Sequence, residues 1–221
     1  FVNLPTPVRE IIRIDGAEAV LASPVERVLD LREATLTTAY TLSANGKRLS
    51  VTHRRFLPRE RPALLLQRLT LTPDMDMVLT VSSGILPDSC NSPIPDDQTK
   101  ANTETVQLSR PGSAELSDQC VSCTFAIRGS GLSVSQEVRF RCPAFARAPG
   151  GGMTVCRSAR AKAGQDLTFD KIAAVRTSRD KDPRIAAIPE DWDFDGLLAE
   201  HRAAWAQVWG VCDLDISAYG G

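Results

Sequence analysis

Four cysteines are the first residues of this chain whose types and spacing could carry chemistry. Cys120 and Cys123 form a Cys-x-x-Cys pair, and Cys142 and Cys156 follow. Four cysteines would be enough to supply the four thiolate ligands of a tetrahedral zinc ion. The pair lies within the run CVSCTFAI, which is typical of a β-strand rather than a tight turn. Residues three apart on a strand point to opposite faces, so the two thiols diverge. We therefore predict ordinary buried thiols and no metal site.

The two histidines, His53 and His201, limit acid–base chemistry. His201 follows Glu200 on a predicted helix, where neighbouring side chains point about 100° apart and form no dyad. The chain contains no His-Glu-x-x-His motif, no Gly-x-Ser-x-Gly motif and no glycine-rich phosphate loop between a strand and a helix. We expect each histidine to be solvated or to cap a helix, and we predict no catalytic residue and no cofactor in this chain.

Two charged clusters could bind ligands, and both have simpler explanations. The basic segment Lys47–Arg61 contains one acidic residue, Glu60, and one aromatic residue, Phe56. Single-stranded nucleic acid is bound by several aromatic side chains among such charges, so a solvated strand face or a charged sheet edge is favoured here. The acidic segment Glu190–Asp195 is better explained by capping of a helix N-terminus and its dipole than by paired catalytic carboxylates.

The composition is that of an ordinary globular protein. The chain has 221 residues, a net charge of -1, 43% hydrophobic residues and 24% charged residues. This charge attracts neither nucleic acid nor an anionic membrane, and no apolar run reaches the roughly 18 residues of a membrane span. Six cysteines are too few for a disulfide framework, and no signal peptide is visible. These observations favour a cytoplasmic location.

Period-two alternation and β-branched residues dominate from Arg9 to Thr177 and predict about ten strands. The turns Asn45-Gly46 and Gly129-Ser130-Gly131 predict two hairpins, and residues 86–101 and 148–152 read as surface loops. Short connections indicate an antiparallel β-sandwich, because a parallel sheet needs helical crossovers. The predicted strands are Val8–Ile14, Ala34–Leu42, Arg48–Phe56, Ala63–Leu71, Met77–Ser83, Thr103–Leu108, Cys120–Ile127, Leu132–Phe140, Met153–Ser158 and Leu167–Thr177.

One amphipathic helix is predicted near the C-terminus, and Asp193 or one of its neighbours can cap its N-terminus. Its apolar residues recur at spacings of three and four and form a single stripe. About 17 helical residues span roughly 25 Å, enough to cross a sandwich face or to bridge to a neighbouring domain. We therefore interpret residues 1–190 as a β-sandwich domain and residues 191–221 as a connecting helix of a larger protein. The stripe comprises Phe194, Leu197, Leu198, Trp205, Val208 and Trp209.

Several of these segments, in this order and spacing, resemble the N-terminal domain of glycoside hydrolase family 65, which includes maltose, kojibiose and trehalose phosphorylases and acid trehalases. The resemblance covers nearly the whole chain and is weakest over residues 86–117. The matching segments are Val2–Pro5, Leu29–Leu36, Arg54–Phe56, Ala63–Arg68, Lys171–Asp180 and Leu197–Trp205.

The resemblance implies a mainly β fold, a large antiparallel β-sandwich with a C-terminal linker helix that leads to an (α/α)6 catalytic barrel. In the family the barrel holds the catalytic glutamate and the phosphate site, so no catalytic residue is carried over onto this chain. The full-length protein would cleave an α-linked glucose disaccharide with inversion, with inorganic phosphate as co-substrate or with water as the attacking group.

The resemblance therefore implies a non-catalytic module whose partner is its own catalytic barrel. We expect it to brace the barrel, to shape the active-site entrance or to support homodimer contacts, with Trp205 and Trp209 at the domain interface. The alternative is a stand-alone carbohydrate-binding module, but Trp192 is the one tryptophan outside the helical stripe. Neither nucleic acid nor a membrane is an expected partner.

Overall fold

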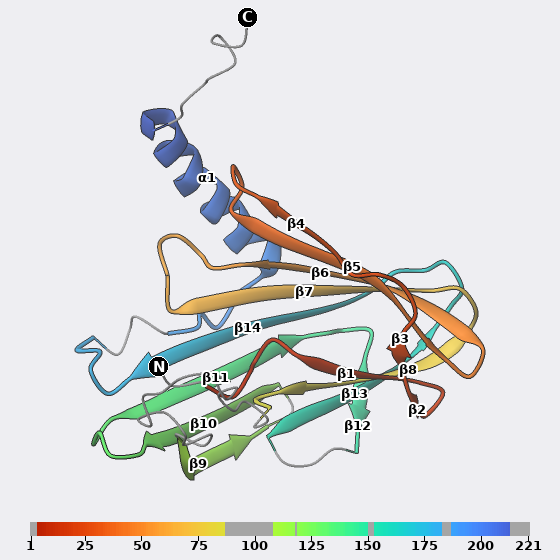
Figure 1. Ribbon diagram of the computed structural model, residues 1–221, viewed down its shortest axis with the longest axis horizontal. Helices are drawn as coiled ribbons and strands as arrows, with labels where there is room; N and C mark the ends of the chain where they lie inside the picture. The colour runs from red at the N-terminus through yellow and green to blue at the C-terminus, as the bar shows by residue number, and fades with distance from the viewer. Residues whose placement is uncertain (1–3, 87–107, 118, 150–152, 183–186, 213–221) are drawn as a thin grey trace, which may run out of the picture.

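The structure is a computed structural model that describes residues 4–86, 108–117, 119–149, 153–182 and 187–212 (Figure 1). Within these ranges, fourteen strands and one helix follow one another. They are β1 (Glu10–Ile14), β2 (Ala17–Glu18), β3 (Val20–Leu21), β4 (Glu26–Asp30), β5 (Thr35–Ala44), β6 (Lys47–Phe56), β7 (Leu64–Pro73), β8 (Met77–Gly84), β9 (Leu108–Leu116), β10 (Cys120–Ile127), β11 (Ser133–Arg141), β12 (Ala146–Ala148), β13 (Thr154–Ala161), β14 (Leu167–Thr177) and α1 (Phe194–Cys212).

The strands form two antiparallel sheets, which confirms the predicted fold class (Figure 1). The small sheet has five strands in the order β12-β13-β8-β1-β2. The large sheet has nine, in the order β3-β5-β6-β7-β14-β11-β10-β9, with β4 paired to β5 beside β3. Strand β8 follows β7 in sequence but belongs to the other sheet, so the chain changes layers between Pro73 and Met77.

The main core lies between the sheets and follows from the alternation of each strand. In β6, for example, Leu49 and Val51 are fully buried, whereas Ser50 and Thr52, which alternate with them, are exposed. Each such fully buried side chain contributes about 1.5–3 kcal/mol. This core joins apolar residues of both sheets, among them Ile12, Ile14, Leu69, Leu71, Leu79, Val81, Phe140 and Phe169.

Both predicted hairpins are confirmed. Strands β5 and β6 pair up to Ala44 and Lys47, with Asn45 and Gly46 at φ of 53° and 73° in the turn between them. Positive φ at both central positions is what a two-residue turn of this hand needs, and asparagine and glycine tolerate it best. Strands β10 and β11 are joined by a longer turn, closed by a hydrogen bond from the Ile127 N–H to the Leu132 carbonyl, in which Gly129 and Gly131 have positive φ.

Nine of the ten predicted strands agree with the structure apart from their ends, and β10 and β14 have the predicted bounds. The exception is Thr103–Leu108: residues 103–107 lie outside the described part, and a strand begins at Leu108. Five strands have no counterpart among the predicted ones: β9 and the four short strands β2, β3, β4 and β12. In β4 all five residues are exposed, so the strand has no buried face and shows no alternation to detect. Most of the two predicted loops, residues 87–101 and 150–152, lies outside the described residues.

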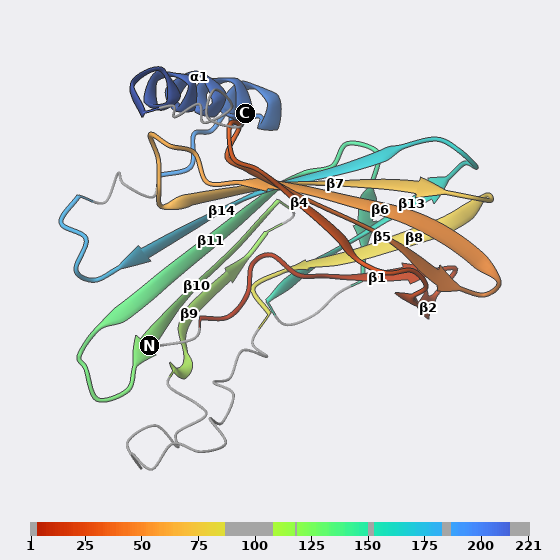
Figure 2. The same cartoon turned by 45° about the horizontal axis from the view of Figure 1, so that its top comes forward.

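A second core lies on the outer face of the large sheet, where α1 covers β6, β7 and β14 (Figure 2). The predicted cap is confirmed: the Asp193 carboxylate accepts hydrogen bonds from the backbone N–H groups of Asp195 and Gly196 at 3.0 and 3.1 Å. Of the apolar stripe of the helix, Phe194, Leu197 and Leu198 pack here. This core consists of Phe56, Leu64, Leu66, Ile172, Ala174, Ile188, Trp192, Phe194, Leu197 and Leu198. Within the described residues, no helix is long and apolar enough to span a membrane.

Candidate functional site

The first turns of α1 are fixed to the large sheet by rings and charges. Phe56 of β6 meets the Phe194 ring edge-on, with the ring centroids 5.3 Å apart. The Arg68 guanidinium lies 4.3 Å from the centroid of the Phe194 ring and donates to Asp195 at 2.8 and 3.0 Å. It also donates two 2.8 Å hydrogen bonds to Asp170 of β14. Asp170 first and Asp195 second raise the pKa of Arg68, although partial burial lowers it. The start of α1 is therefore held rigidly.

His201 continues this anchor and is only 2% exposed. Its Nδ1 accepts from the backbone N–H of Arg59 at 3.2 Å, so Nε2 carries the proton and lies 3.2 Å from the carbonyl oxygen of Ala34. The expectation that His201 is solvated or caps a helix is therefore wrong. The sequence did contain a signal, because position 201 lies seven residues after Phe194 and four before Trp205, on the apolar stripe.

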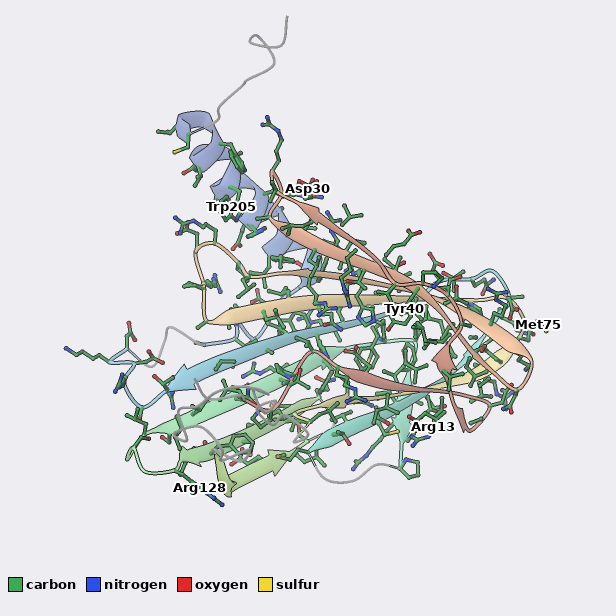
Figure 3. The ribbon with its side chains drawn as sticks, in the orientation of Figure 1. Arg13, Asp30, Tyr40, Met75, Arg128 and Trp205 are labelled. Carbon is green, nitrogen blue, oxygen red and sulfur yellow. The ribbon has the colours of Figure 1, made fainter. Side chains whose placement is uncertain are left out.

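The predicted interface residues, Trp205 and Trp209, lie in the C-terminal half of α1 and are both half-buried. Trp205 lies on the side of the helix that faces Asp30 at the end of β4 (Figure 3). Their ring centroids are 6.4 Å apart. The Trp209 indole donates from Nε1 to the carbonyl oxygen of Arg32 at 3.1 Å. The buried Nε1 of Trp205 has no hydrogen-bond partner among the described residues, and the Arg59 guanidinium lies 6.0 Å from the Trp205 ring.

The turn between β4 and β5, which contains Arg32, is also bound to α1 by an ion pair. Glu33 accepts from Arg54 of β6 at 2.6 Å and from Arg202 of α1 at 2.7 Å. A shallow pocket opens beside this junction and is lined by Arg32, Glu33, Arg202, Ala206, Trp209 and Gly210. The helix thus ends against residues 31–34 with indole surface still open to solvent. That arrangement suits a contact with another protein surface, since half-buried tryptophans are common anchors of interfaces.

A second group of polar residues, which we call the inter-sheet polar cluster, lies inside the sandwich. Its carboxylate, Glu10 of β1, forms an ion pair with Lys171 of β14. Their side chains are 2% and 1% exposed. Gln67 Nε2 lies 2.7 Å from Glu10 Oε1 and 3.0 Å from His53 Nδ1, and the ammonium of Lys171 donates to Ser83 Oγ at 3.0 Å. The cluster consists of Glu10, His53, Gln67, Ser83 and Lys171.

His53 is therefore also buried, which corrects the expectation that it is solvated. Because Gln67 donates to Nδ1, the proton lies on Nε2, which is 2.7 Å from the Tyr40 hydroxyl. Burial lowers the pKa of His53 to about 4, against the opposing effect of Glu10. Burial and Glu10 both raise the pKa of Tyr40 to about 12. Enclosed in this way, the cluster joins the two sheets and lies out of reach of a substrate.

The basic segment was interpreted as a solvated strand face or as a charged sheet edge. The second interpretation is wrong. Strand β6 lies between β5 and β7 in the interior of the large sheet. Two of its charges are paired: Lys47 lies 2.7 Å from the Asp15 carboxylate, and Arg54 is bound by Glu33.

The five cysteines that the structure describes are free thiols. The Cys-x-x-Cys pair lies on β10 as predicted, with Cys123 buried and Cys120 half-buried. Burial raises the pKa of both thiols. Cys212 is exposed, contrary to the expectation of buried thiols, because it is the last residue of α1 and lies beyond the sheet. In the described ranges, no three histidine, cysteine or acidic side chains are grouped so that they could hold a metal ion. Cys90 lies outside those ranges.

The two sheets and the packing of α1 on the large sheet define a large antiparallel β-sandwich domain with a helix on its outer face. Residues 1–208 match the N-terminal domain of glycosyl hydrolase family 65, and the chain belongs to this family. The resemblance seen in the sequence is thereby confirmed.

Similar proteins agree with this assignment. Uncharacterized glycosyl hydrolases from two Mycobacterium tuberculosis strains, CDC 1551 / Oshkosh and H37Rv, are each 27% identical over 239 residues, covering 98% of this chain and 18% of their own length. A solved structure assigned as a kojibiose phosphorylase, from the human microbiome, has the same fold, with a TM-score of 0.71 and 12% identity. The alignment covers 94% of this chain and 28% of that one. The chain thus spans less than a third of each of these proteins.

Proposed function

We propose that this domain is the non-catalytic N-terminal module of an inverting α-glucoside phosphorylase or hydrolase, and that it braces the catalytic portion of that protein. The observation that carries the proposal is the difference in burial between the two ends of α1. Its first turns are fixed to the sheet by Phe194, Leu197 and His201, all 5% exposed or less, whereas Trp205 and Trp209 near its other end are only half-buried. A helix whose first turns are buried in its own domain and whose last turns keep indole surface exposed is suited to join two bodies.

The acidic residues next to the helix support a structural role. Inverting cleavage uses two carboxyl groups about 6.5–9.5 Å apart that face a substrate. Here Asp193 caps α1, and Asp195 is bound by Arg68. These carboxylates are thus occupied in holding the helix. We place the acid, and the site for phosphate or water, in the catalytic portion, which acts on a disaccharide such as maltose, kojibiose or trehalose.

Further parts of the proposal follow from the family. The similar proteins are described as glycosyl hydrolases and as a kojibiose phosphorylase, which supports an α-linked glucose disaccharide as substrate. We further propose a cytoplasmic protein in which this module shapes the active-site entrance or takes part in a homodimer contact.

The test compares three proteins: this chain, the longer protein encoded when the reading frame is followed beyond Gly221, and that protein without residues 1–208. Release of glucose or glucose 1-phosphate from each disaccharide is measured with and without phosphate. We expect activity from the longer protein, none from this chain, and a lower melting midpoint or insolubility of the catalytic portion alone. A catalytic portion that keeps its full activity and midpoint without the module would refute bracing.

The same experiment addresses the alternative of a stand-alone carbohydrate-binding module. Every phenylalanine that the structure describes is buried, and so is Trp192, which leaves few aromatic surfaces for a sugar. We expect titration of this chain with maltose, kojibiose or trehalose to leave its tryptophan fluorescence unchanged. A saturable change would favour the carbohydrate-binding module instead.

A further inference from the structure

A rim of exposed apolar side chains runs along one border of the large sheet. We call it the β3–β4 rim. Elsewhere in the described structure, large exposed apolar residues are scattered, and scattered ones are normal on any protein surface. A cluster of this kind instead marks an interaction site. Its members are Val20, Leu21, Val28, Leu29 and Leu31, which are 64, 56, 63, 60 and 64% exposed.

The rim includes a strand edge. Strand β4 pairs with β5 on one side only, and all five of its residues are exposed. Successive strand residues point to opposite faces, so Val28 and Leu29 project on the two sides of the edge. The backbone groups between them form an open hydrogen-bonding border. An occupant would therefore bury apolar side chains and satisfy backbone groups together.

A second copy of the chain is a poor occupant for this edge. An antiparallel pairing of two β4 strands centred on Val28 would place Glu26 of one copy opposite Asp30 of the other, and like charges directly opposite are destabilising. A pairing centred on Leu29 would place Asp30 opposite Val28, which pairs a charge with an apolar side chain. The charges of β4 therefore act against self-pairing.

The rim is continuous with the open end of α1. The hydrogen bond from Trp209 to Arg32 and the ion pair of Arg202 with Glu33 hold the last turns of α1 against residues 31–34, immediately after β4 (Figures 1 and 3). Val211, near the end of the helix, is 87% exposed. The helix therefore carries the chain to the same side of the molecule as the rim.

We infer that the β3–β4 rim is the surface on which the catalytic portion of the longer protein docks, next to its contact with Trp205 and Trp209. This inference rests on the proposed function. It is supported by the direction of α1 and by the length of the similar proteins, of which this chain covers only 18% and 28%. The occupant is a surface with apolar side chains that meet Leu29 and Leu31 and with backbone or side-chain partners for the edge of β4.

The test is hydroxyl-radical footprinting, read by mass spectrometry, of this chain and of the longer protein. Oxidation of Leu29 and Leu31 is expected to fall by about fivefold or more in the longer protein, because the centre of an interface excludes water. Met75 and Leu116, which are 51 and 52% exposed, are the controls and should not change. Met75 lies at the far end of the large sheet from Trp205 and Asp30 (Figure 3).

The outcomes separate this inference from the proposed function. Protection of Trp209 without protection of Leu29 and Leu31 would overturn the rim as a docking surface and leave the proposed function standing. No protection at any of the three would overturn both. Protection in this chain alone that grows with its concentration would show that a second copy covers the rim.

A pair of substitutions gives an independent readout. Leu29→Ser with Leu31→Ser should leave the melting midpoint of this chain unchanged, because both side chains are already exposed, and should lower that of the longer protein by several degrees. Leu116→Ser is the matched control and should change neither midpoint. An unchanged midpoint of the longer protein with both rim substitutions would contradict the inference.

Discussion

Replacing Lys171 by methionine would remove one partner of an ion pair that lies inside the sandwich. The side chains of Lys171 and Glu10 are 1% and 2% exposed, and the pair joins β14 of the large sheet to β1 of the small one. Methionine has a similar length, so little volume is lost, but the Glu10 carboxylate is left as an uncompensated buried charge. Such a loss typically destabilises a protein by about 3–5 kcal/mol. We expect a loss of this size in the free energy of unfolding of this chain.

The assay is urea unfolding at neutral pH, in which the loss appears as a lower midpoint with an unchanged slope. Lys162→Met is the matched control, because Lys162 forms a similar ion pair with Asp76 at the surface, where the side chains are 68% and 59% exposed. Exposed pairs of this kind contribute little, so this variant should keep the original midpoint.

The double variant Lys171→Met with Glu10→Leu tests the coupling. Replacing a buried pair by apolar residues is often neutral, and Gln67 keeps its hydrogen bond to His53, so most of the stability should return, with a remaining loss of about 1–2 kcal/mol. A loss for Lys171→Met no larger than that of the surface control would refute the claim that the pair is desolvated. Additive losses in the double variant would refute the coupling of the two residues.

Three further predictions concern the inter-sheet polar cluster and α1. Burial lowers the pKa of His53 in the folded state to about 4 from an ordinary value of 6.5, so the folded state binds fewer protons than the unfolded state between these pH values. The contribution of neutral His53 to the free energy of unfolding is therefore present above about pH 6.5. It is lost as the pH falls through 4, by roughly 3 kcal/mol in full. His53→Gln should flatten this part of a stability–pH profile, and an unchanged profile would contradict the burial. Trp205→Ala removes a half-buried ring and should destabilise this chain by about 2 kcal/mol, less than the 3–5 kcal/mol typical of a fully buried one; an unchanged urea midpoint would refute any packing of the ring within the domain. Gly196→Ala would place a Cβ 2.4 Å from Asp193 Oδ2 and so disturb the cap, and it should lower the midpoint about as much as Asp193→Ala, near 1 kcal/mol. A Gly196→Ala variant with a raised midpoint, as helix propensity alone predicts, would show that the cap moves freely.

Local features of the chain could be predicted from the sequence because they depend on neighbouring residues. The Asn45-Gly46 turn requires positive φ at two adjacent positions, and the strands on either side of it then pair. Asp193 caps α1 because its carboxylate reaches N–H groups two and three residues further on. The family resemblance belongs here too, since it depends on the order of such segments.

Neither histidine could be placed from the sequence alone. His53 lies on a strand with charged neighbours, yet its partners Tyr40 and Gln67 come from β5 and β7, and its carboxylate neighbour comes from the other sheet. His201 contacts the backbone at Ala34, 167 residues away. A polar residue can be buried only where such partners assemble, and their assembly depends on sheet pairing.

The sequence by itself determined the strands with a buried face, their hairpins, the helix and its cap, because each of these depends on contacts between residues close in the chain. The tertiary structure alone decided that β8 leaves the sheet of β7, that Glu10 meets Lys171 across 161 residues, and that β4 is an exposed apolar edge beside Trp209. These features depend on which strands become neighbours. Which strands become neighbours is decided by the apolar surface that distant segments bury against each other. The local sequence pattern does not contain this information.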